Sequence, residues 1–343
     1  MKILVTGGLG FIGTNFLDLF VSRFSGHEFL NFDAVTYAAN ERWAKQECPN
    51  YHFVRGDIGD ADGVKRVVAD WRPELIVHLA AETHVDRSIS APRPFLRSNV
   101  DGTVNLLEAA KHVGARFHHV STDEVYGSLG EHGYFTERSR YEPSSPYSAS
   151  KASSDHFVRA YHRTFDLPVT ITNCSNNYGP YQHPEKLIPL MISRAIEGKP
   201  LPIYGDGGNV RDWLYVLDHC EAIWRVAMNG TPGETYLVGG GAERKNVDVV
   251  DVICETVASA RGIDKAELLK LKTPVPDRPG HDRRYAIDHW KISSELGWKP
   301  NEGFESGIRK TVLWYLANSD WLHGIVRSTE FSEWTKGNYE NRG

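Results

Sequence analysis

The most constraining feature of the chain is a set of glycines directly after its first hydrophobic segment. Residues 3–6 (ILVT) are short, apolar and rich in β-branched side chains, which predicts a buried strand. Gly7, Gly10 and Gly13 follow, and residues 16–21 are apolar at helical spacing. Glycines here permit a tight strand-to-helix turn and let a diphosphate approach the helix N-terminus. The pattern predicts an α/β fold of the Rossmann type, with a doubly wound parallel sheet.

An acidic residue at the end of the next predicted strand favours one dinucleotide over another. This strand spans 28–32 and leads to Asp33, 20 residues after Gly13. A carboxylate at that place accepts a hydrogen bond from a ribose 2′-hydroxyl and repels a 2′-phosphate. An ordinary strand-to-helix turn would not require the acid. We therefore expect NAD rather than NADP.

Two adjacent carboxylates follow another predicted strand. Residues 117–121 (FHHVS) suit a buried strand, and Thr122, Asp123 and Glu124 come next. Ligands of an open parallel sheet bind just beyond the carboxyl ends of its strands. Unpaired charges are costly to bury in a core. The acid pair is therefore expected to face a crevice.

A tyrosine and a lysine four residues apart form a candidate base. Ser144–Pro146 opens a helical pattern that carries Tyr147 and Lys151 on one face. A nearby ammonium favours phenolate, so we expect the pKa of Tyr147 to fall from about 10. Such a phenolate can take a proton from a sugar hydroxyl. The spacing is weak evidence alone and strong evidence beside a dinucleotide-binding turn.

Composition excludes several function classes. Hydrophobic residues make up 41% of the 343 residues and charged residues 24%, as in soluble globular enzymes, and the net charge of -5 suggests no nucleic-acid partner. The four cysteines are widely spaced, which predicts free thiols in a reducing compartment. His118 and His119 would face opposite sides of a strand, so we expect no metal site. No apolar run approaches membrane length, and we expect a cytoplasmic protein without membrane association.

The rhythm of alternating strands and helices breaks after residue 179. Prolines punctuate the chain from Pro180 onward, and 204–208 is a glycine-rich turn. We predict a smaller, mixed α/β substrate-binding lobe beside the Rossmann domain. The NAD-binding domain is expected to comprise 1–179, about 221–245 and 293–317. The sugar-nucleotide domain is expected to comprise about 180–220, 246–292 and 318–343.

Two predicted helices could join two copies of the chain. The helices, over 99–113 and from Tyr147 onward, each carry an apolar side. These sides are formed by Val100, Val104, Leu107 and Ala110 and by Ala152, Phe157, Ala160 and Tyr161. Paired across a two-fold axis, they would form a four-helix bundle. We expect a homodimer, with burial inside one subunit as the alternative.

From residue 2 to about 316, the chain resembles the extended short-chain dehydrogenase/reductase family, and within it the dTDP-glucose 4,6-dehydratases. The motifs that carry the resemblance are TGGLGFIG (6–13), HLAAETHVDRS (78–88), STDEVYG (121–127), PYSASKASSDH (146–156), NCSNNYGPYQHPEKLIPL (173–190), YGDGGNVRDWLYV (204–216) and DRPGHD (277–282). The Asp123–Glu124 pair distinguishes it from related epimerases, which usually lack this pair. Ala39 departs from the glycine common in the family, which puts the shape of that loop in doubt.

The resemblance implies a redox-neutral, NAD-dependent elimination in deoxysugar biosynthesis. It would convert dTDP-glucose to dTDP-4-keto-6-deoxyglucose by oxidation at C4, loss of water across C5 and C6, and return of the hydride to C6. Tyr147, helped by Thr122 and Lys151, would take the 4-hydroxyl proton. Glu124 would be the base at C5 and Asp123 the acid at the 6-hydroxyl. Which carboxylate holds the proton at rest stays open.

The resemblance also implies sets of binding residues. The candidate cofactor-binding residues are Gly7, Gly10, Phe11, Ile12, Gly13, Asp33, Asp57, Ile58, Leu79, Ala80, Ala81, Thr83, Ser98, Tyr147, Lys151 and Asn177. The candidate substrate-binding residues are Thr83, Thr122, Asn176, Lys186, Leu187, Pro202, Tyr204, Arg211, Asn246, Arg278 and His281. Alternative functions are a UDP-glucose 4,6-dehydratase, a nucleotide-sugar C4 epimerase and a non-catalytic NAD-binding regulator.

Overall fold

The computed structural model describes residues 1–340, and its larger part is a seven-stranded parallel sheet. The strand order is β10-β6-β5-β4-β1-β2-β3, so the winding direction reverses between β4 and β1. The strands are β1 (Lys2–Thr6), β2 (Glu28–Asp33), β3 (Tyr51–Arg55), β4 (Leu75–His78), β5 (Arg116–Thr122), β6 (Val169–Cys174) and β10 (Thr235–Val238). This arrangement confirms the predicted doubly wound fold and opens a crevice at the carboxyl ends of the strands.

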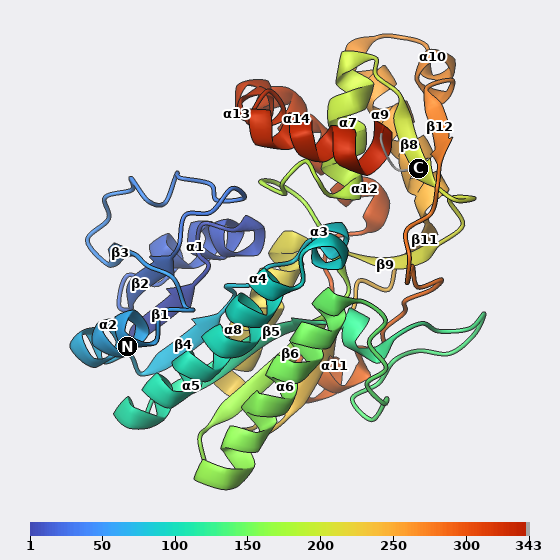
Figure 1. The fold of residues 1–343 in the computed structure, drawn as a ribbon. Helices are drawn as coiled ribbons and strands as arrows, with labels where there is room; N and C mark the ends of the chain where they lie inside the picture. The colour runs from blue at the N-terminus through green and yellow to red at the C-terminus, as the bar shows by residue number, and fades with distance from the viewer. Residues whose placement is uncertain (341–343) are drawn as a thin grey trace.

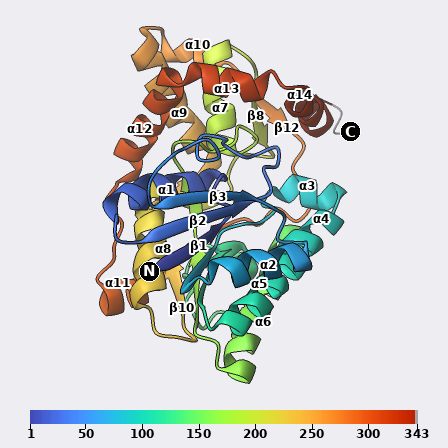
Figure 2. The ribbon, with the colours of Figure 1, turned by 90° about the vertical axis from the view of Figure 1, so that its left-hand side faces the viewer.

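Helices cover both faces of this sheet (Figures 1 and 2). Alternate residues of β1 face opposite layers: Ile3 and Val5 pack against one helix layer and Leu4 against the other. The layer against Ile3 contains α1 (Phe11–Arg23) and α8 (Val216–Asn229), and α11 (Trp290–Leu296) packs beside α8 and β10. The opposite layer contains α2 (Ala61–Trp71), α5 (Gly102–Val113) and α6 (Pro146–Phe165). Burial on both faces explains the continuously apolar strands.

Local sequence signals account for the start of α6 but not for that of α5. Ser145 caps α6 through a reciprocal capping box with Ser148, as the Ser-Ser-Pro pattern predicted. The helix predicted over 99–113 is present, but its first turn belongs to a π-helical segment, η1 (Leu96–Asp101), that precedes α5. The hydroxyls of Thr103 and Ser154 both donate to the Asn99 carbonyl, each at 2.6 Å. These bonds compete with the regular helical pattern.

The second lobe contains small sheets and a group of helices (upper part of Figure 1). Its mixed sheet has the order β11-β9-β7, and β8 pairs with β12. The strands are β7 (Asn176–Tyr178), β8 (Leu201–Tyr204), β9 (Val210–Tyr215), β11 (Glu243–Lys245) and β12 (Lys272–Val275). The helices are α7 (Leu187–Glu197), α9 (Asn246–Arg261), α10 (Lys265–Leu269), α12 (Phe304–Ala317), α13 (Ser319–Val326), α14 (Thr329–Thr335) and η3 (Lys336–Glu340). This agrees with the predicted smaller lobe of mixed structure.

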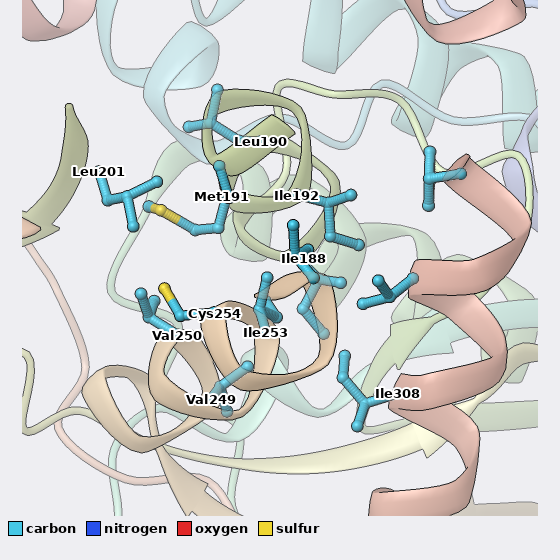
Figure 3. Packing of buried hydrophobic residues seen from close by; sticks show 14 of the residues in the cluster. Ile188, Leu190, Met191, Ile192, Leu201, Val249, Val250, Ile253, Cys254 and Ile308 are labelled. Atoms are coloured by element: carbon cyan, nitrogen blue, oxygen red, sulfur yellow. The ribbon is translucent and has the colours of Figure 1, made fainter. Parts of the chain in front are cut away.

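The core of the second lobe shows where α12 belongs. Ile188 and Met191 of α7 pack against Ile253 of α9, and Ile308 of α12 joins the same cluster (Figure 3). Within the predicted segment 293–317, α11 packs on the large sheet and α12 packs in the lobe. The predicted domain division stays a prediction.

Three short helices follow the carboxyl ends of β4 and β5. They are α3 (Val85–Ser90), α4 (Arg93–Phe95) and the single turn η2 (Asp123–Tyr126). Nearby, Ala39 is not among the residues of 1–340 that have a positive φ, so alanine is accommodated in this loop without backbone strain. No helix within residues 1–340 combines the length and the apolar character needed to span a bilayer.

Candidate active site

The glycine turn after β1 forms a cradle that suits a diphosphate. Gly10 begins α1 and no side chain caps this helix N-terminus. Gly7 has a φ of +72°, and a Cβ there would lie 2.6 Å from the backbone of Ala80. A Cβ on Gly13 would lie 2.2 Å from the Gly7 carbonyl oxygen. The glycines keep the turn tight, so the amides at the start of α1, including those of Phe11 and Ile12, are open to an anion.

Asp33 is placed to receive a ribose. It is buried at the end of β2 and accepts hydrogen bonds from the amides of Leu9 at 2.9 Å and Val35 at 2.8 Å. Burial raises its pKa, and these two bonds oppose the rise. Asp57 differs, because it is half-exposed and binds Arg97 at 2.6 Å. The structure thus brings Asp33 to the glycine turn and leaves Asp57 in a surface ion pair.

The other predicted cofactor residues surround the same edge of the sheet. Leu79 and Ala80 donate their amides to the backbone and side chain of Thr6, which holds the end of β4 against the glycine turn. Ile58 lies buried against Gly102, and Ser98 lies half-buried in η1. The side-chain oxygen of Asn177 accepts a hydrogen bond from His219 Nδ1 at 2.9 Å. Ala81 and Thr83 continue the segment after β4.

The acid pair lies at the end of β5, as predicted. Thr122 caps η2: its hydroxyl accepts from the Glu124 amide at 3.3 Å and donates to Asp123 Oδ1 at 3.4 Å. Asp123 is 1% exposed, and its Oδ2 has no hydrogen-bond partner among residues 1–340. Burial raises the pKa of Asp123 well above its usual range, and the charges of Glu124 and Asp212 add to the rise. This environment favours a protonated Asp123.

Glu124 has a different environment from its neighbour. It lines a cavity of about 160 Å³ and is partly exposed to it. Burial raises its pKa, but the positive charges of Arg278, Lys186 and Arg211 oppose the rise. Cations therefore support an ionised Glu124, whereas Asp123 is buried beside a further acid. Two carboxyl groups in such different surroundings can act as an acid and a base in the same step.

The prediction that the pKa of Tyr147 is lowered is wrong. Tyr147 is buried, and burial raises its pKa well above the ordinary value, with a further rise from Glu124. Lys151 shares the helical face, but its ammonium donates to the Val120 carbonyl at 2.9 Å and lies 3.4 Å from His119 Nε2. The i, i+4 spacing indicated proximity, but it could not reveal the cost of burial or the partners that hold the lysine.

Most of the predicted substrate residues line the cavity that Glu124 faces. They belong to the second lobe, whereas Glu124 belongs to the large sheet, and they are Asn176, Lys186, Leu187, Pro202, Tyr204, Arg211, Asn246, Arg278 and His281. Asn177 lines it too. Thr83 and Thr122 do not line this cavity, although the Thr83 carbonyl accepts from Lys186 Nζ at 2.7 Å. Residues scattered over more than a hundred positions of the sequence thus converge on one space.

Three cations make this cavity suitable for a diphosphate. Arg211 is buried, donates to the Asp282 carbonyl at 2.8 Å and lies over the Tyr285 ring at 4.2 Å. Burial lowers the pKa of both Arg211 and Lys186. Arg278 Nε is buried without a hydrogen-bond partner among the described residues. Buried cations with free donors favour an anionic ligand.

The C-terminal segment 318–343 is expected in the sugar-nucleotide domain, but none of its residues is among the predicted site residues. Tyr339 of η3 lines the cavity and stacks on Tyr204 with ring centres 5.8 Å apart. Asn338 Nδ2 donates to the Tyr204 hydroxyl at 2.7 Å. Glu185, also in the cavity wall, accepts from Arg87 Nε at 3.1 Å. The aromatic residues of the tail were the only signal in the sequence, and they do not specify where the tail folds.

The comparison of fold and site now defines the class of the protein. A glycine turn and a Tyr/Lys helix lie at the carboxyl edge of one parallel sheet, where Glu124 faces a cation-lined cavity. This arrangement belongs to the extended short-chain dehydrogenase/reductases. Within residues 1–340 there is no cluster of three side chains able to hold a metal ion.

Comparisons with known proteins identify the family more closely. A family model described as GDP-mannose 4,6 dehydratase matches residues 4–311. A dTDP-glucose 4,6-dehydratase of Shigella flexneri is 52% identical over 363 aligned positions that cover all of both chains. The dTDP-glucose 4,6-dehydratase of Bacillus anthracis, solved in complex with NAD, has a TM-score of 0.85, with 47% identity over 95% of this chain and 99% of that one. The Streptomyces venezuelae enzyme, also solved with NAD, has a TM-score of 0.88, with 45% identity over 95% of this chain and 100% of that one. The chain belongs to the dTDP-glucose 4,6-dehydratase family.

Proposed function

We propose that the chain is an NAD-dependent hydro-lyase that converts dTDP-glucose to dTDP-4-keto-6-deoxyglucose in deoxysugar biosynthesis. The observation that carries this proposal is the pair of adjacent acids at the end of β5. One is buried beside further negative charge, and the other faces a cavity that contains three cations. Loss of water from a sugar needs an acid and a base in one place, in addition to the base that takes the hydroxyl proton during hydride transfer.

The residues of the glycine turn fit NAD. The open amides at the start of α1 would hold its diphosphate, and Asp33 would accept from a ribose hydroxyl. When bound, NAD accepts the hydride from C4 of the sugar and returns it to C6. Asn177 of β7 and Lys151 of α6 would lie on the nicotinamide side.

Tyr147 would remove the proton of the glucose 4-hydroxyl. Its phenol is buried, and the side chain of Thr122 lowers a pKa that burial otherwise raises. Lys151 would stabilise the phenolate by its positive charge. A buried phenol can act as a base only where its phenolate is stabilised by a cation or a polar neighbour. Lys151 and Thr122 would provide this stabilisation.

Glu124 and Asp123 would carry out the elimination. A ketone at C4 acidifies the C5 proton, which Glu124 takes as an ionised base supported by Arg278 and Lys186. Asp123, kept protonated by burial, gives its proton to the leaving 6-hydroxyl so that water departs. The division of roles follows from the different surroundings of the two carboxyl groups.

The cavity would hold the nucleotide part of the substrate. The cations Lys186, Arg211 and Arg278 would bind the diphosphate. The remaining wall would surround the base and sugars, with Asn176, Leu187, Pro202, Tyr204, Asn246 and His281. Thr83 would contact the glucose from the segment after β4, where its carbonyl already holds Lys186.

Product analysis tests the assignment. We expect dTDP-glucose, incubated with the protein in deuterium oxide, to give a 4-keto-6-deoxy product that carries deuterium at C5, seen by mass spectrometry and NMR. UDP-glucose is the matched comparison, and its preferential turnover would reassign the nucleotide. Formation of a C4 epimer without loss of water would contradict the proposal.

We further propose a homodimer that forms through α5 and α6, which lie side by side (Figures 1 and 2). Leu107, Ala110, Ala152 and Tyr161 are buried inside the subunit, which removes them from the predicted contact. Phe157 remains 41% exposed on α6. We expect Phe157→Asp to shift the mass measured by light scattering from dimer to monomer, with Tyr134→Asp, another exposed aromatic residue, as the control.

The free thiols support a cytoplasmic location.

A further inference from the structure

Lys151 is a buried cation whose direct partners are all neutral. Its ammonium is bonded to the Val120 carbonyl and lies 3.4 Å from His119 Nε2. Among residues 1–340 it makes no direct hydrogen bond or ion pair with a carboxylate. Burial lowers the pKa of Lys151 to about 8. A buried ammonium without a countercharge tends to lose its proton.

The nearest compensating charge is Asp155, one helical turn further along α6. Its Oδ1 lies 3.2 Å from His119 Nε2, and its Oδ2 accepts from Tyr141 at 2.7 Å and Asn173 at 3.0 Å. Burial raises its pKa, but hydrogen bonding to His119 and the positive charges of Arg159 and Lys151 hold that pKa below its usual range. Asp155 is therefore a negative charge placed directly behind Lys151.

His119 lies between the two charges. One nitrogen, Nε2, is within 3.4 Å of the Lys151 ammonium and 3.2 Å of the Asp155 carboxylate. Burial, followed by the charge of Lys151, lowers the pKa of His119 to about 4, so the ring is neutral. A neutral ring here separates the ions by one side chain.

We propose that His119 and Asp155 are positioning residues of the reaction: Asp155 supplies the countercharge that keeps Lys151 protonated, and His119 spaces the two ions. This inference rests on the proposed function, because Lys151 acts on the substrate through Tyr147. Neither His119 nor Asp155 lines the cavity.

Asp155 is the only carboxylate among the titratable and charged groups that face this cluster within the described residues. The others are His78 of β4, His118 of β5, Tyr126 of η2, Tyr141 of the following loop, Arg159 of α6 and Cys174 of β6. Burial keeps His78 and Cys174 neutral by moving their pKa values away from the working range. Removal of the Asp155 charge would leave Lys151 and Arg159 as two cations without a nearby anion.

The isosteric variant Asp155→Asn tests the countercharge in the holoenzyme. With lysines labelled at 13Cε, the Lys151 signal is assigned by its loss in Lys151→Met and titrated by NMR. We expect its midpoint to fall by about one pH unit or more in Asp155→Asn. Reduction of bound NAD after mixing with dTDP-glucose should show the matching change. The rate of this reduction falls at high pH as Lys151 loses its proton. In Asp155→Asn this fall should occur at lower pH, and at pH values above the new midpoint the reduction should be about tenfold slower than in the wild type.

Two substitutions of His119 test the spacer. A glutamine can accept from Lys151 and donate to Asp155, whereas a leucine can do neither. We expect His119→Gln to keep the Lys151 midpoint close to that of the wild type and His119→Leu to lower it. His118→Gln and His118→Leu are the matched controls, because His118 is equally buried on the same strand but is bonded to Thr170 at 2.9 Å and to Thr172. These controls should leave the midpoint unchanged.

The outcomes separate this inference from the proposed function. An unchanged Lys151 midpoint in Asp155→Asn, in an enzyme that turns over dTDP-glucose, would overturn the inference alone. A wild-type protein that forms no dehydrated product would contradict the proposed function, while the lysine titration would still report on the countercharge. If His119→Gln behaves like His119→Leu, the spacer role is wrong. The NAD content and thermal midpoint of each variant confirm that the titrated molecules are folded.

Discussion

The two sides of the crevice achieve their chemistry in different ways. On the sheet side, Thr122, Asp123 and Glu124 are consecutive residues at the end of one strand, and their functional difference comes from burial. On the lobe side, Lys186, Arg211 and Arg278 come from three distant segments, and together they make one cation-lined cavity. The sheet side should therefore control the chemical steps and the lobe side the binding of the nucleotide.

The largest effect should come from the sheet side. We expect Glu124→Gln to lower kcat by about 10²- to 10⁴-fold, because the base at C5 is lost while oxidation at C4 remains possible. Bound reduced cofactor should accumulate, seen by its near-ultraviolet absorbance. Glu131→Gln, an exposed glutamate of the loop after β5, is the control. Normal turnover of Glu124→Gln would show that Glu124 is not the base at C5 and would contradict the catalytic role of the sheet side.

A smaller effect, of a different kind, should come from the lobe side. Arg278→Gln removes a cation whose Nε is buried without a protein partner within residues 1–340. We expect KM for dTDP-glucose to rise about 10- to 100-fold with little change in kcat, as for loss of a hydrogen bond to a charged group. Arg283→Gln, which removes an exposed partner of Asp206, should leave KM unchanged. A fall in kcat with constant KM would instead place Arg278 in the chemical step.

The C-terminal segment sharpens the comparison further. Tyr339→Leu removes the ring that stacks on Tyr204 but keeps an apolar side chain. We expect KM to rise about 3- to 10-fold, as for loss of one aromatic pair. Steady-state kinetics checks this, with Tyr134→Leu, an exposed aromatic residue, as the control. An unchanged KM would exclude the segment from the nucleotide site.

The smallest effect should be a shift of the pH profile. Activity should fall at low pH as Glu124 gains a proton and at high pH as Asp123 loses one, and both pKa values are raised by burial. Asp212, whose own pKa is raised to about 6, is negative above that pH and raises the pKa of Asp123. Asp212→Asn should therefore lower the Asp123 pKa and move the high-pH limb downward, with about threefold less activity on that limb. A shift of this limb to higher pH would contradict the role of Asp123 as the acid.

Part of the site could be predicted because its residues are adjacent in the chain. The turn at Gly7–Gly13, the acid at the end of β2 and the pair after β5 each follow a strand directly. In a parallel sheet, this position alone brings them to one edge. The Ser145 cap and the i, i+4 spacing likewise placed Tyr147 and Lys151 on one helical face.

Other properties depended on contacts between distant segments. Tyr147 has a raised pKa because the folded protein buries it, and Lys151 is held by Val120 and His119 of a neighbouring strand rather than by the phenol. The packing of α12 in the second lobe and the stacking of Tyr339 on Tyr204 follow from long-range contacts. The sequence by itself determined which groups stand at the ends of the strands, because local patterns specify strands, turns and helix starts. Only the tertiary structure decided their charge states and partners, since desolvation and ion pairing depend on everything packed around a group.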